Sequence, residues 1–402
     1  MAINLELPRK MQAVIDKAHQ GAAQMMRPIA RKYDLREHAY PVELDTLANL
    51  FTGAAESNAL GLTGAEAFRG GGDKEENRNG ANMAAVLQTL EASWGDAAMM
   101  LSMPYQGLGN AAISGVATDE QLSRLGSVWA AMAITEPSFG SDSAAVTTTA
   151  KPDGDDYVIN GEKIFVTAGS RATHIVVWAT LDKSQGRPAI KSFIVPREHP
   201  GVTVERLESK LGIKGSDTAV IRFDNARIPK SNLLGNPEIE SGKGFSGVME
   251  TFDNTRPVVA AMAVGIARAT LEELRKILTD AGVEISYDKP SHAQSAAAAE
   301  FLRMEADWEA SYQLTLRAAW QADNKIPNSK EASMAKAKAG RVGSDITLKA
   351  VEMVGTSGYS EQSLLEKWAR DSKIMDIFEG TQQIQQLVVA RRLLGLSSAE
   401  LK

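Results

Sequence analysis

The sequence contains no cysteine. Disulfides, catalytic thiolates and cysteine-ligated iron–sulfur clusters are therefore excluded. Histidine is also scarce, with five scattered copies and no pair at the helical spacing of metal ligands, so we expect no metal site. A basic excess is missing as well: the 44 Lys and Arg are outnumbered by 50 Asp and Glu, which gives a net charge of −6 and argues against a nucleic-acid partner.

The sequence also lacks long apolar runs. No stretch is long enough to span a bilayer, and the first residues, MAINLELPRKMQ, show no apolar run behind a basic start. We therefore expect no membrane partner and, by default, a cytoplasmic location. The chain has 402 residues, 44% of them hydrophobic, which is enough for two or three packed domains.

Local patterns follow the order helices, strands, helices. Residues 1–130 show helical periodicity broken by glycine, which predicts an N-terminal helical domain. The polar, glycine-rich segment Arg69–Asn77 is interpreted as a solvated surface loop in preference to a lid over a site. Residues 131–244 carry about six short β-rich runs and predict a small antiparallel sheet or barrel. Within that region, Asp153-Gly154 predicts a turn, and the Asn160-Gly161 pair between apolar runs predicts a hairpin.

Residues 245–402 return to helical periodicity and predict a C-terminal helical bundle. Two apolar stripes at helical spacing are interpreted as bundle core in preference to a cofactor site. One consists of Phe301, Met304, Trp308, Tyr312 and Leu316, and the other, in the last helix, of Ile384, Leu387 and Val388.

Five ordered segments carry a family resemblance. They are Ala133–Asp142, Phe165–Gly169, Lys210–Thr218, Phe252–Pro257 and Arg370–Gln385. Together they resemble the signature regions of the acyl-CoA dehydrogenase family, in the same order and over nearly the whole chain. The resemblance implies a mainly α fold: an N-terminal helical domain, a β-barrel or sandwich in the middle and a C-terminal four-helix bundle. It also implies FAD as cofactor, an acyl-CoA as substrate and electron-transfer flavoprotein as electron acceptor.

The chemistry of the family explains the residue types. The thioester loses a weakly acidic α-proton to a base and a β-hydride to the flavin, so the base needs a dry site that raises its pKa. Glu379 matches the family's base in the string Phe-Glu-Gly-Thr, whereas on its own it would pass for a surface carboxylate near a helix N-terminus. Some members place the base immediately before the arginine that matches Arg256. Thr255 stands there and cannot serve, which implies the subgroup with a C-terminal glutamate base.

The resemblance also implies cofactor and substrate contacts. Thr135, Ser141, Phe165, Thr167 and Thr381 match FAD-binding positions. Phe165 stands where a tryptophan is common, which keeps the stacking surface and loses an indole N–H. For Thr135 and Ser141, turn formation is the alternative, and for Thr381 it is a helix N-cap. Ser141, Arg256 and Gly380 match positions near the substrate. A buried structural ion pair is an equal alternative for Arg256.

One part of the family pattern is missing. Members usually carry an arginine that holds the FAD pyrophosphate of a neighbouring subunit, and Val283 stands at that position. A second neighbour-facing contact, normally a glutamine, is Glu352, which would repel a phosphate. We therefore expect this chain to be one subunit of a hetero-oligomer with a second acyl-CoA dehydrogenase-like chain. Alternatively, a homo-oligomer holds FAD by another route, such as Lys289.

Three functions remain open on this basis. The first is dehydrogenation of an acyl-CoA to the trans-2-enoyl-CoA. The second is a flavin oxidase on the same scaffold, and the third is a non-catalytic partner subunit. Glu379 argues against the third, and Val283 and Glu352 are the observations that keep it open. The acyl chain length and branching cannot be inferred, because pocket depth depends on residues from several helices.

Overall fold

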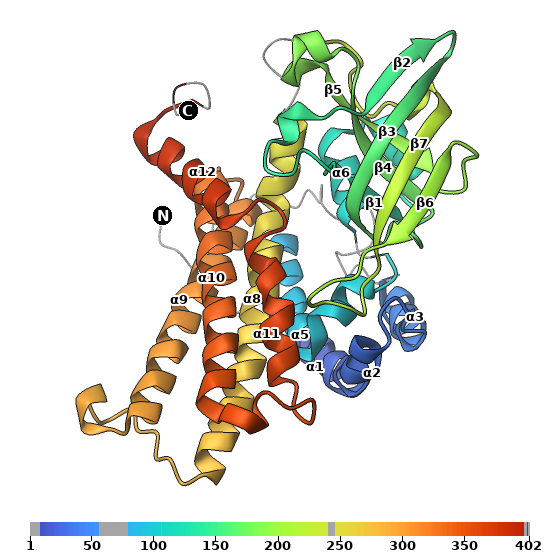
Figure 1. The fold of residues 1–402 in the computed structure, drawn as a ribbon. Helices are drawn as coiled ribbons and strands as arrows, with labels where there is room; N and C mark the ends of the chain where they lie inside the picture. Colours follow the sequence, from blue (N-terminus) through green and yellow to red (C-terminus); the bar gives the residue numbers. More distant parts are fainter. Residues whose placement is uncertain (1–8, 56–78, 106, 240–245, 398–399, 401–402) are drawn as a thin grey trace.

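The computed structural model describes residues 9–55, 79–105, 107–239, 246–397 and 400. The segment Arg69–Asn77 lies outside these residues. The chain folds as the resemblance implies, with a helical N-terminal part, a curled β domain in the middle and a C-terminal helical domain (Figure 1). Among the described residues, no helix combines the length and the apolarity needed to cross a membrane.

The N-terminal part consists of helices, some of which pack directly against the C-terminal helices. The longest helix here, α5, lies along α8 in Figure 1, and their backbones pack so closely that a Cβ on Gly265 would come within 2.3 Å of Leu90 O. Both helices contribute to a single apolar core, so the first and last parts of the chain are not separate units. The helices are α1 (Arg9–Gly21), α2 (Ala30–Leu35), α3 (Glu43–Ala55), α5 (Ala81–Ser102), α6 (Leu108–Val116) and α7 (Asp119–Leu125).

The middle part is one seven-stranded sheet in the order β1-β4-β2-β3-β7-β6, with β5 also paired to β4. The apolar strand β4 is buried on both faces, as its sequence HIVVWAT favours. Contrary to the expectation of an antiparallel sheet, β1 and β2 each pair with β4 in parallel. The strands are β1 (Ala130–Ala133), β2 (Thr149–Asp153), β3 (Asp156–Thr167), β4 (His174–Thr180), β5 (Ile190–Pro196), β6 (Val202–Leu207) and β7 (Thr218–Pro229).

The hairpin prediction at Asn160-Gly161 is wrong. The turn between β2 and β3 falls at Gly154, as predicted for Asp153-Gly154, and Asn160-Gly161 lies inside β3. There the pairing of β3 with β7 shifts register, and Gly161 has a φ of 152°. A Cβ on Gly161 would meet Thr148 Oγ1 at 2.4 Å, so the glycine serves a bulge and a close approach of two backbones.

The C-terminal part is built from three long helices and two shorter ones. The long helices are α8 (Ser246–Asp280), α9 (Ala296–Asp323) and α10 (Ser329–Val354). They are followed by α11 (Leu365–Ser372), the 3-10 turn η9 (Lys373–Asp376) and α12 (Gln382–Leu394), which lies across the end of the bundle in Figure 1.

The two apolar stripes predicted as bundle core differ in burial. On α9, Phe301, Met304 and Leu316 are at most 2% exposed, and Trp308 and Tyr312 pack against the same core, which confirms the first stripe. The second stripe is not bundle core. Leu387 is 41% exposed, and Ile384 and Val388 are only partly covered. The helix α12 instead turns an apolar side outward, and its one fully buried residue is Gln385.

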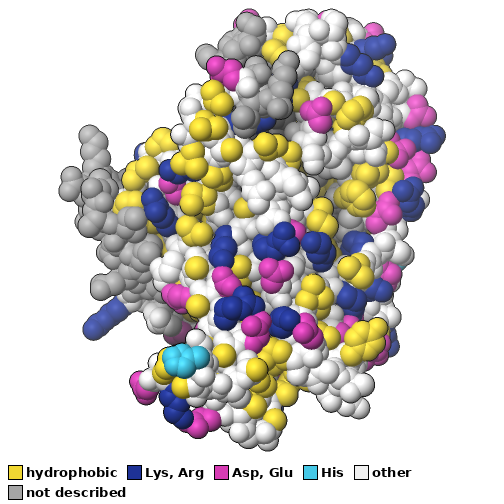
Figure 2. Space-filling model, turned by 60° about the vertical axis from the view of Figure 1, so that its left-hand side comes forward, with side chains coloured by type: hydrophobic (Ala, Val, Ile, Leu, Met, Phe, Trp, Pro, Cys, Tyr) yellow, Lys and Arg dark blue, Asp and Glu magenta, His cyan; other side chains and the backbone are white. Residues whose placement is uncertain are grey.

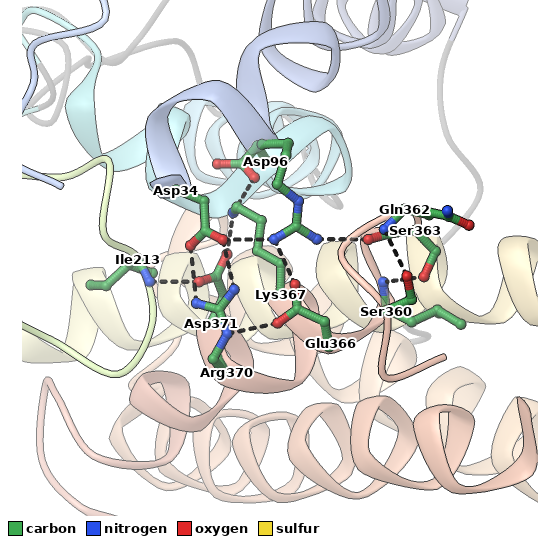
Figure 3. Close-up of polar contacts among 12 residues, drawn as sticks. Asp34, Asp96, Ile213, Ser360, Gln362, Ser363, Glu366, Lys367, Arg370 and Asp371 are labelled. Atoms are coloured by element: carbon green, nitrogen blue, oxygen red, sulfur yellow. Dashed lines mark hydrogen bonds and ion pairs between the residues drawn. The ribbon is translucent and has the colours of Figure 1, made fainter. Parts of the chain in front are cut away.

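A buried network of charges joins the three parts of the chain (Figure 3). The ammonium of Lys367, on α11, lies between the carboxylates of Asp96 on α5 and Asp371 on α11, and all three side chains are almost completely buried. Asp371 also accepts a hydrogen bond from Ile213 N of the β domain (2.5 Å). Because a buried charge needs a partner, this network fixes the relative position of the three parts.

One face of the molecule carries mixed charge. On the face drawn in Figure 2, Lys and Arg side chains are interspersed with Asp and Glu side chains, and neither sign dominates. This face therefore offers no continuous basic surface of the kind that binds nucleic acid.

Candidate active site

Glu379 lies in the short segment between η9 and α12, where its carboxylate reaches α8. Thr255 Oγ1, on α8, donates a hydrogen bond to Glu379 Oε2 at 3.0 Å. Thr255 is 7% exposed and its neighbour Arg256 is 3% exposed, so both lie inside the bundle. The two positions at which the resemblance implies a base, those of Glu379 and Thr255, are therefore side by side in this fold.

The surroundings of Glu379 shape its acidity. Part of the residue remains open to solvent, yet the protein around the carboxylate desolvates it enough to raise its pKa above the ordinary value. The hydrogen bond from Thr255 and the positive charges of Arg256 and Lys336 oppose this rise. A carboxylate with a raised pKa is a stronger base than an ordinary carboxylate and is therefore suited to accept a proton from a weak carbon acid.

The backbone around Glu379 is held in an unusual conformation. Glu379 has a φ of 56° and Gly380 a φ of 89°, so two consecutive residues are left-handed. The Gln385 side chain donates to Glu379 O (2.9 Å) and to Gly380 O (3.2 Å). Lys336 Nζ, from α10, donates to Gly380 O at 2.6 Å. Thr381 then caps α12, because its hydroxyl accepts from Ile384 N (3.4 Å), as predicted for a helix N-cap.

A second group of the predicted site residues lies on the β domain. Thr135 O accepts a hydrogen bond from Ile164 N (2.9 Å), which places the segment after β1 next to the end of β3. The register of β3 shifts again between Lys163 and Val166, and Phe165 in this bulge has a φ of 57°. Since a bulge re-aims a side chain, Phe165 points outward and is 58% exposed, with Thr167 half-buried two residues further on.

Phe165 is the exposed aromatic member of this second group. An exposed aromatic face is unfavourable in water and suits a flat aromatic ring. Thr167 follows Phe165 by two residues, and the backbone of Thr135 pairs with Ile164, the residue before Phe165. Ser141 is exposed. The structure thus leaves the aromatic side chain of Phe165 exposed on the β domain, with the segment around Thr135 next to it.

Sequence reasoning missed the buried ion pair beneath this group. Lys163 Nζ is 2.8 Å from Glu136 Oε1 and also donates to Ile134 O (3.1 Å). The Glu136 carboxylate accepts further hydrogen bonds from Thr147 and Thr148. Burial alone would raise the pKa of Glu136, but the charge of Lys163 and these hydrogen bonds lower it to about 2. The pair therefore holds the segment around Thr135 against β3.

Sequence reasoning also missed Lys336 and Gln385. Lys336 stands among the alanines of α10, with Ala332, Ala335 and Ala339 on the same buried side. A lysine at a buried position of a helical period is the only signal that the sequence offers for it. Gln385 falls within the quoted motif, yet only the fold shows that its amide turns back to the carbonyls of the Glu379–Gly380 turn.

The positions expected to bind a neighbour's FAD have different surroundings. Val283 is partly buried and packs against the core of the bundle. Glu352 is exposed and forms an ion pair with Lys349 (2.6 Å). Lys289, the alternative cation, is paired with Glu284 at 2.8 Å. None of these three side chains is arranged as a free cationic donor for a pyrophosphate.

The fold and the clustered residues define a three-part chain with a desolvated glutamate in its bundle and an exposed aromatic on its β domain. Family models for the acyl-CoA dehydrogenase middle domain and C-terminal domain match residues 131–226 and 242–394. This chain therefore belongs to the acyl-CoA dehydrogenase family.

Individual proteins agree with this assignment. The bovine mitochondrial short-chain specific acyl-CoA dehydrogenase is 40% identical over 262 residues, which span 65% of this chain but only 62% of that protein, less than two thirds of its length. A probable acyl-CoA dehydrogenase of Bacillus subtilis is 32% identical and covers 98% of this chain and 100% of its own. The structure of butyryl-CoA dehydrogenase from Megasphaera elsdenii superposes with a TM-score of 0.83 at 30% identity, over 98% of this chain and 100% of that chain.

Proposed function

We propose that this protein catalyses the α,β-dehydrogenation of an acyl-CoA thioester to the trans-2-enoyl-CoA, with FAD as cofactor and Glu379 as the base. The observation that carries the proposal is the Glu379 carboxylate, which is desolvated and yet contacted by Thr255 and faced by Arg256 and Lys336. Under this proposal the chain belongs to the family subgroup with a C-terminal glutamate base.

The residues of the bundle perform the proton transfer in this proposal. Glu379 removes the α-proton, because burial makes it a stronger base than an ordinary carboxylate. Thr255 donates to one carboxylate oxygen, which orients the other toward the substrate. Arg256 and Gly380 belong to the same cluster, and they are the residues that we propose to contact the substrate. The proton ends on Glu379, whose neutral form is the one that burial favours.

The residues of the β domain hold the cofactor in this proposal. Phe165 supplies the exposed stacking face, and the hydroxyl groups of Thr135 and Thr167 form hydrogen bonds to the bound FAD. Ser141 and Thr381 are further FAD contacts in the family pattern, and Ser141 also faces the substrate. When bound, FAD accepts the β-hydride of the substrate. We propose three domains, over residues 1–130, 131–244 and 245–402, of which the first and the last share one apolar core.

The assembly that we propose is a hetero-oligomer with a second acyl-CoA dehydrogenase-like subunit, with electron-transfer flavoprotein as the electron acceptor. Two observations support a partner chain: Val283 and Glu352 stand where cation or amide donors are expected, and α12 turns apolar side chains outward. The exposed side chains of α12 include Leu393 and Leu394, at 68% and 64% exposure. A pyrophosphate removed from water needs donors that the partner would supply.

The test of the activity is anaerobic titration of the purified, FAD-containing protein with a panel of saturated acyl-CoA esters. The proposal expects loss of flavin absorbance near 450 nm, on the order of one equivalent per site, and a trans-2-enoyl-CoA by mass. A protein that leaves every ester unchanged contradicts the activity. Rapid oxygen consumption with peroxide release would favour the oxidase alternative.

The test of the assembly is expression of the chain alone and purification from its native host. Alone, the chain should be largely colourless, and the native complex should contain a second chain and fewer flavins than chains. A homotetramer with FAD in every subunit would contradict the hetero-oligomer. It would favour the alternative in which a homo-oligomer holds FAD through another cation, such as Lys289.

A further inference from the structure

The turn that carries Glu379 needs external support. A non-glycine residue with a φ of 56° is uncommon and persists only when its surroundings hold it. Gly380 continues the left-handed path, and a Cβ at that position would meet Gln385 Nε2 at 2.4 Å. The direction of the Glu379 side chain is therefore set by whatever fixes the two carbonyl groups of this turn.

Two buried donors from different helices fix these carbonyls. The amide of Gln385, 0% exposed, spans Glu379 O and Gly380 O from within α12. The ammonium of Lys336, 1% exposed, reaches Gly380 O from α10 at 2.6 Å. A hydrogen bond from a charged donor is shorter and stronger than one between neutral groups. Lys336 thus ties the turn to a rigid helix of the bundle.

Lys336 also brings a positive charge into this part of the bundle. The charged groups around it are Asp376 on η9, Glu379 on the turn and Arg256 on α8. Burial lowers the pKa of Lys336 to about 8, while the two carboxylates work in the opposite direction, so it remains mainly protonated at neutral pH. A buried ammonium is costly, and the neighbouring acidic groups compensate only part of this cost.

We propose that Lys336 is a positioning residue for the base: it fixes the Glu379–Gly380 turn through the carbonyl of Gly380 and holds a positive charge near the Glu379 carboxylate. The inference rests on the proposed function, in which Glu379 accepts the α-proton. The positive charge favours the ionised carboxylate, which is the form that can accept a proton. The hydrogen bond keeps the carboxylate pointed at the substrate.

The test compares Lys336→Met with Lys338→Met in the FAD-loaded native oligomer. Lys338 lies on the same helix but pairs with Asp307 (2.6 Å), so it is a control for loss of a lysine from α10. The readout is the pH dependence of kcat/KM for the acyl-CoA that is turned over fastest. Lys336→Met should move the acidic limb to higher pH by on the order of one unit, and Lys338→Met should leave it in place. The plateau kcat should also fall while KM changes by less than about twofold, because the base is misplaced rather than the substrate site.

An acidic limb that stays in place in a folded, flavin-containing Lys336→Met protein would overturn the proposal. Lys336→Gln, which retains a polar group without the charge, should show the same shift of the limb. If neither variant can be obtained folded with FAD, Lys336 is a structural residue and the proposal is likewise overturned. Glu379→Gln, assayed in parallel, separates the two hypotheses: if it stays active, the proposed base is wrong, and if it is inactive while the limb stays in place, only the role of Lys336 is wrong.

Discussion

The hydrogen bond between Thr255 and Glu379 makes a quantitative prediction about the base. Thr255→Val removes the donor and keeps the shape of the side chain. Because the donor stabilises the ionised carboxylate, its loss should raise the pKa of Glu379. A hydrogen bond to a charged group contributes about 1.5–3 kcal/mol, and one pKa unit corresponds to about 1.4 kcal/mol. Since Arg256 and Lys336 remain to favour the ionised form, we expect a rise of about one unit.

The assay is the pH profile of kcat/KM, whose acidic limb reports the ionisation of the base in the free enzyme. The base works deprotonated, so the limb should move to higher pH, and below it kcat/KM should be about tenfold lower than in the unmodified protein. Thr270→Val is a matched control, because Thr270 is fully buried on the same helix and bonds to Ile266 O (3.0 Å). A Thr255→Val protein whose limb coincides with that of the control would refute the account of the site.

Two further changes test other parts of the structure. Thr167→Ala should weaken FAD binding roughly two- to tenfold, since one hydrogen bond contributes about 0.5–1.5 kcal/mol, and unchanged affinity by flavin fluorescence would remove Thr167 from the cofactor site. Lys367→Met leaves the carboxylates of Asp96 and Asp371 buried without a counter-charge, so the free energy of unfolding in urea should fall by about 3–5 kcal/mol. Lys373→Met, at a largely exposed lysine, should change it by less than about 1 kcal/mol, and equal effects of the two lysine changes would contradict the importance of the network.

Local sequence signals succeeded where local interactions decide the structure. The cap at Thr381 and the turn at Gly154 depend on residues within a few positions of each other. The order of helices, strands and helices follows from periodicity. The position of Glu379 followed from a contiguous motif, although its use as the base remains a proposal.

The failures have a common physical cause. Asn160-Gly161 has the composition of a hairpin turn, but the pairing of β3 with β7, which joins residues as far apart in the sequence as Gly161 and Phe223, overrides it. An apolar stripe such as the one through Leu387 has the same helical period whether it packs in the bundle core or lies on the surface. Periodicity alone therefore could not predict that this stripe is exposed. Lys336 reaches the site only because α10 packs beside the turn. Each of these outcomes depends on contacts between segments that are distant in the sequence.

The central claim is that Glu379 is the base, and Glu379→Gln tests it most directly. The change is nearly isosteric, so the fold and the bound flavin should be retained. Turnover of the best acyl-CoA should fall by a factor of ~10²–10⁴ or more, because general-base catalysis contributes at least this much and no other base is proposed. Glu361→Gln, at an exposed position before α11, should keep normal turnover. Near-normal turnover in a folded, flavin-containing Glu379→Gln protein would contradict the account.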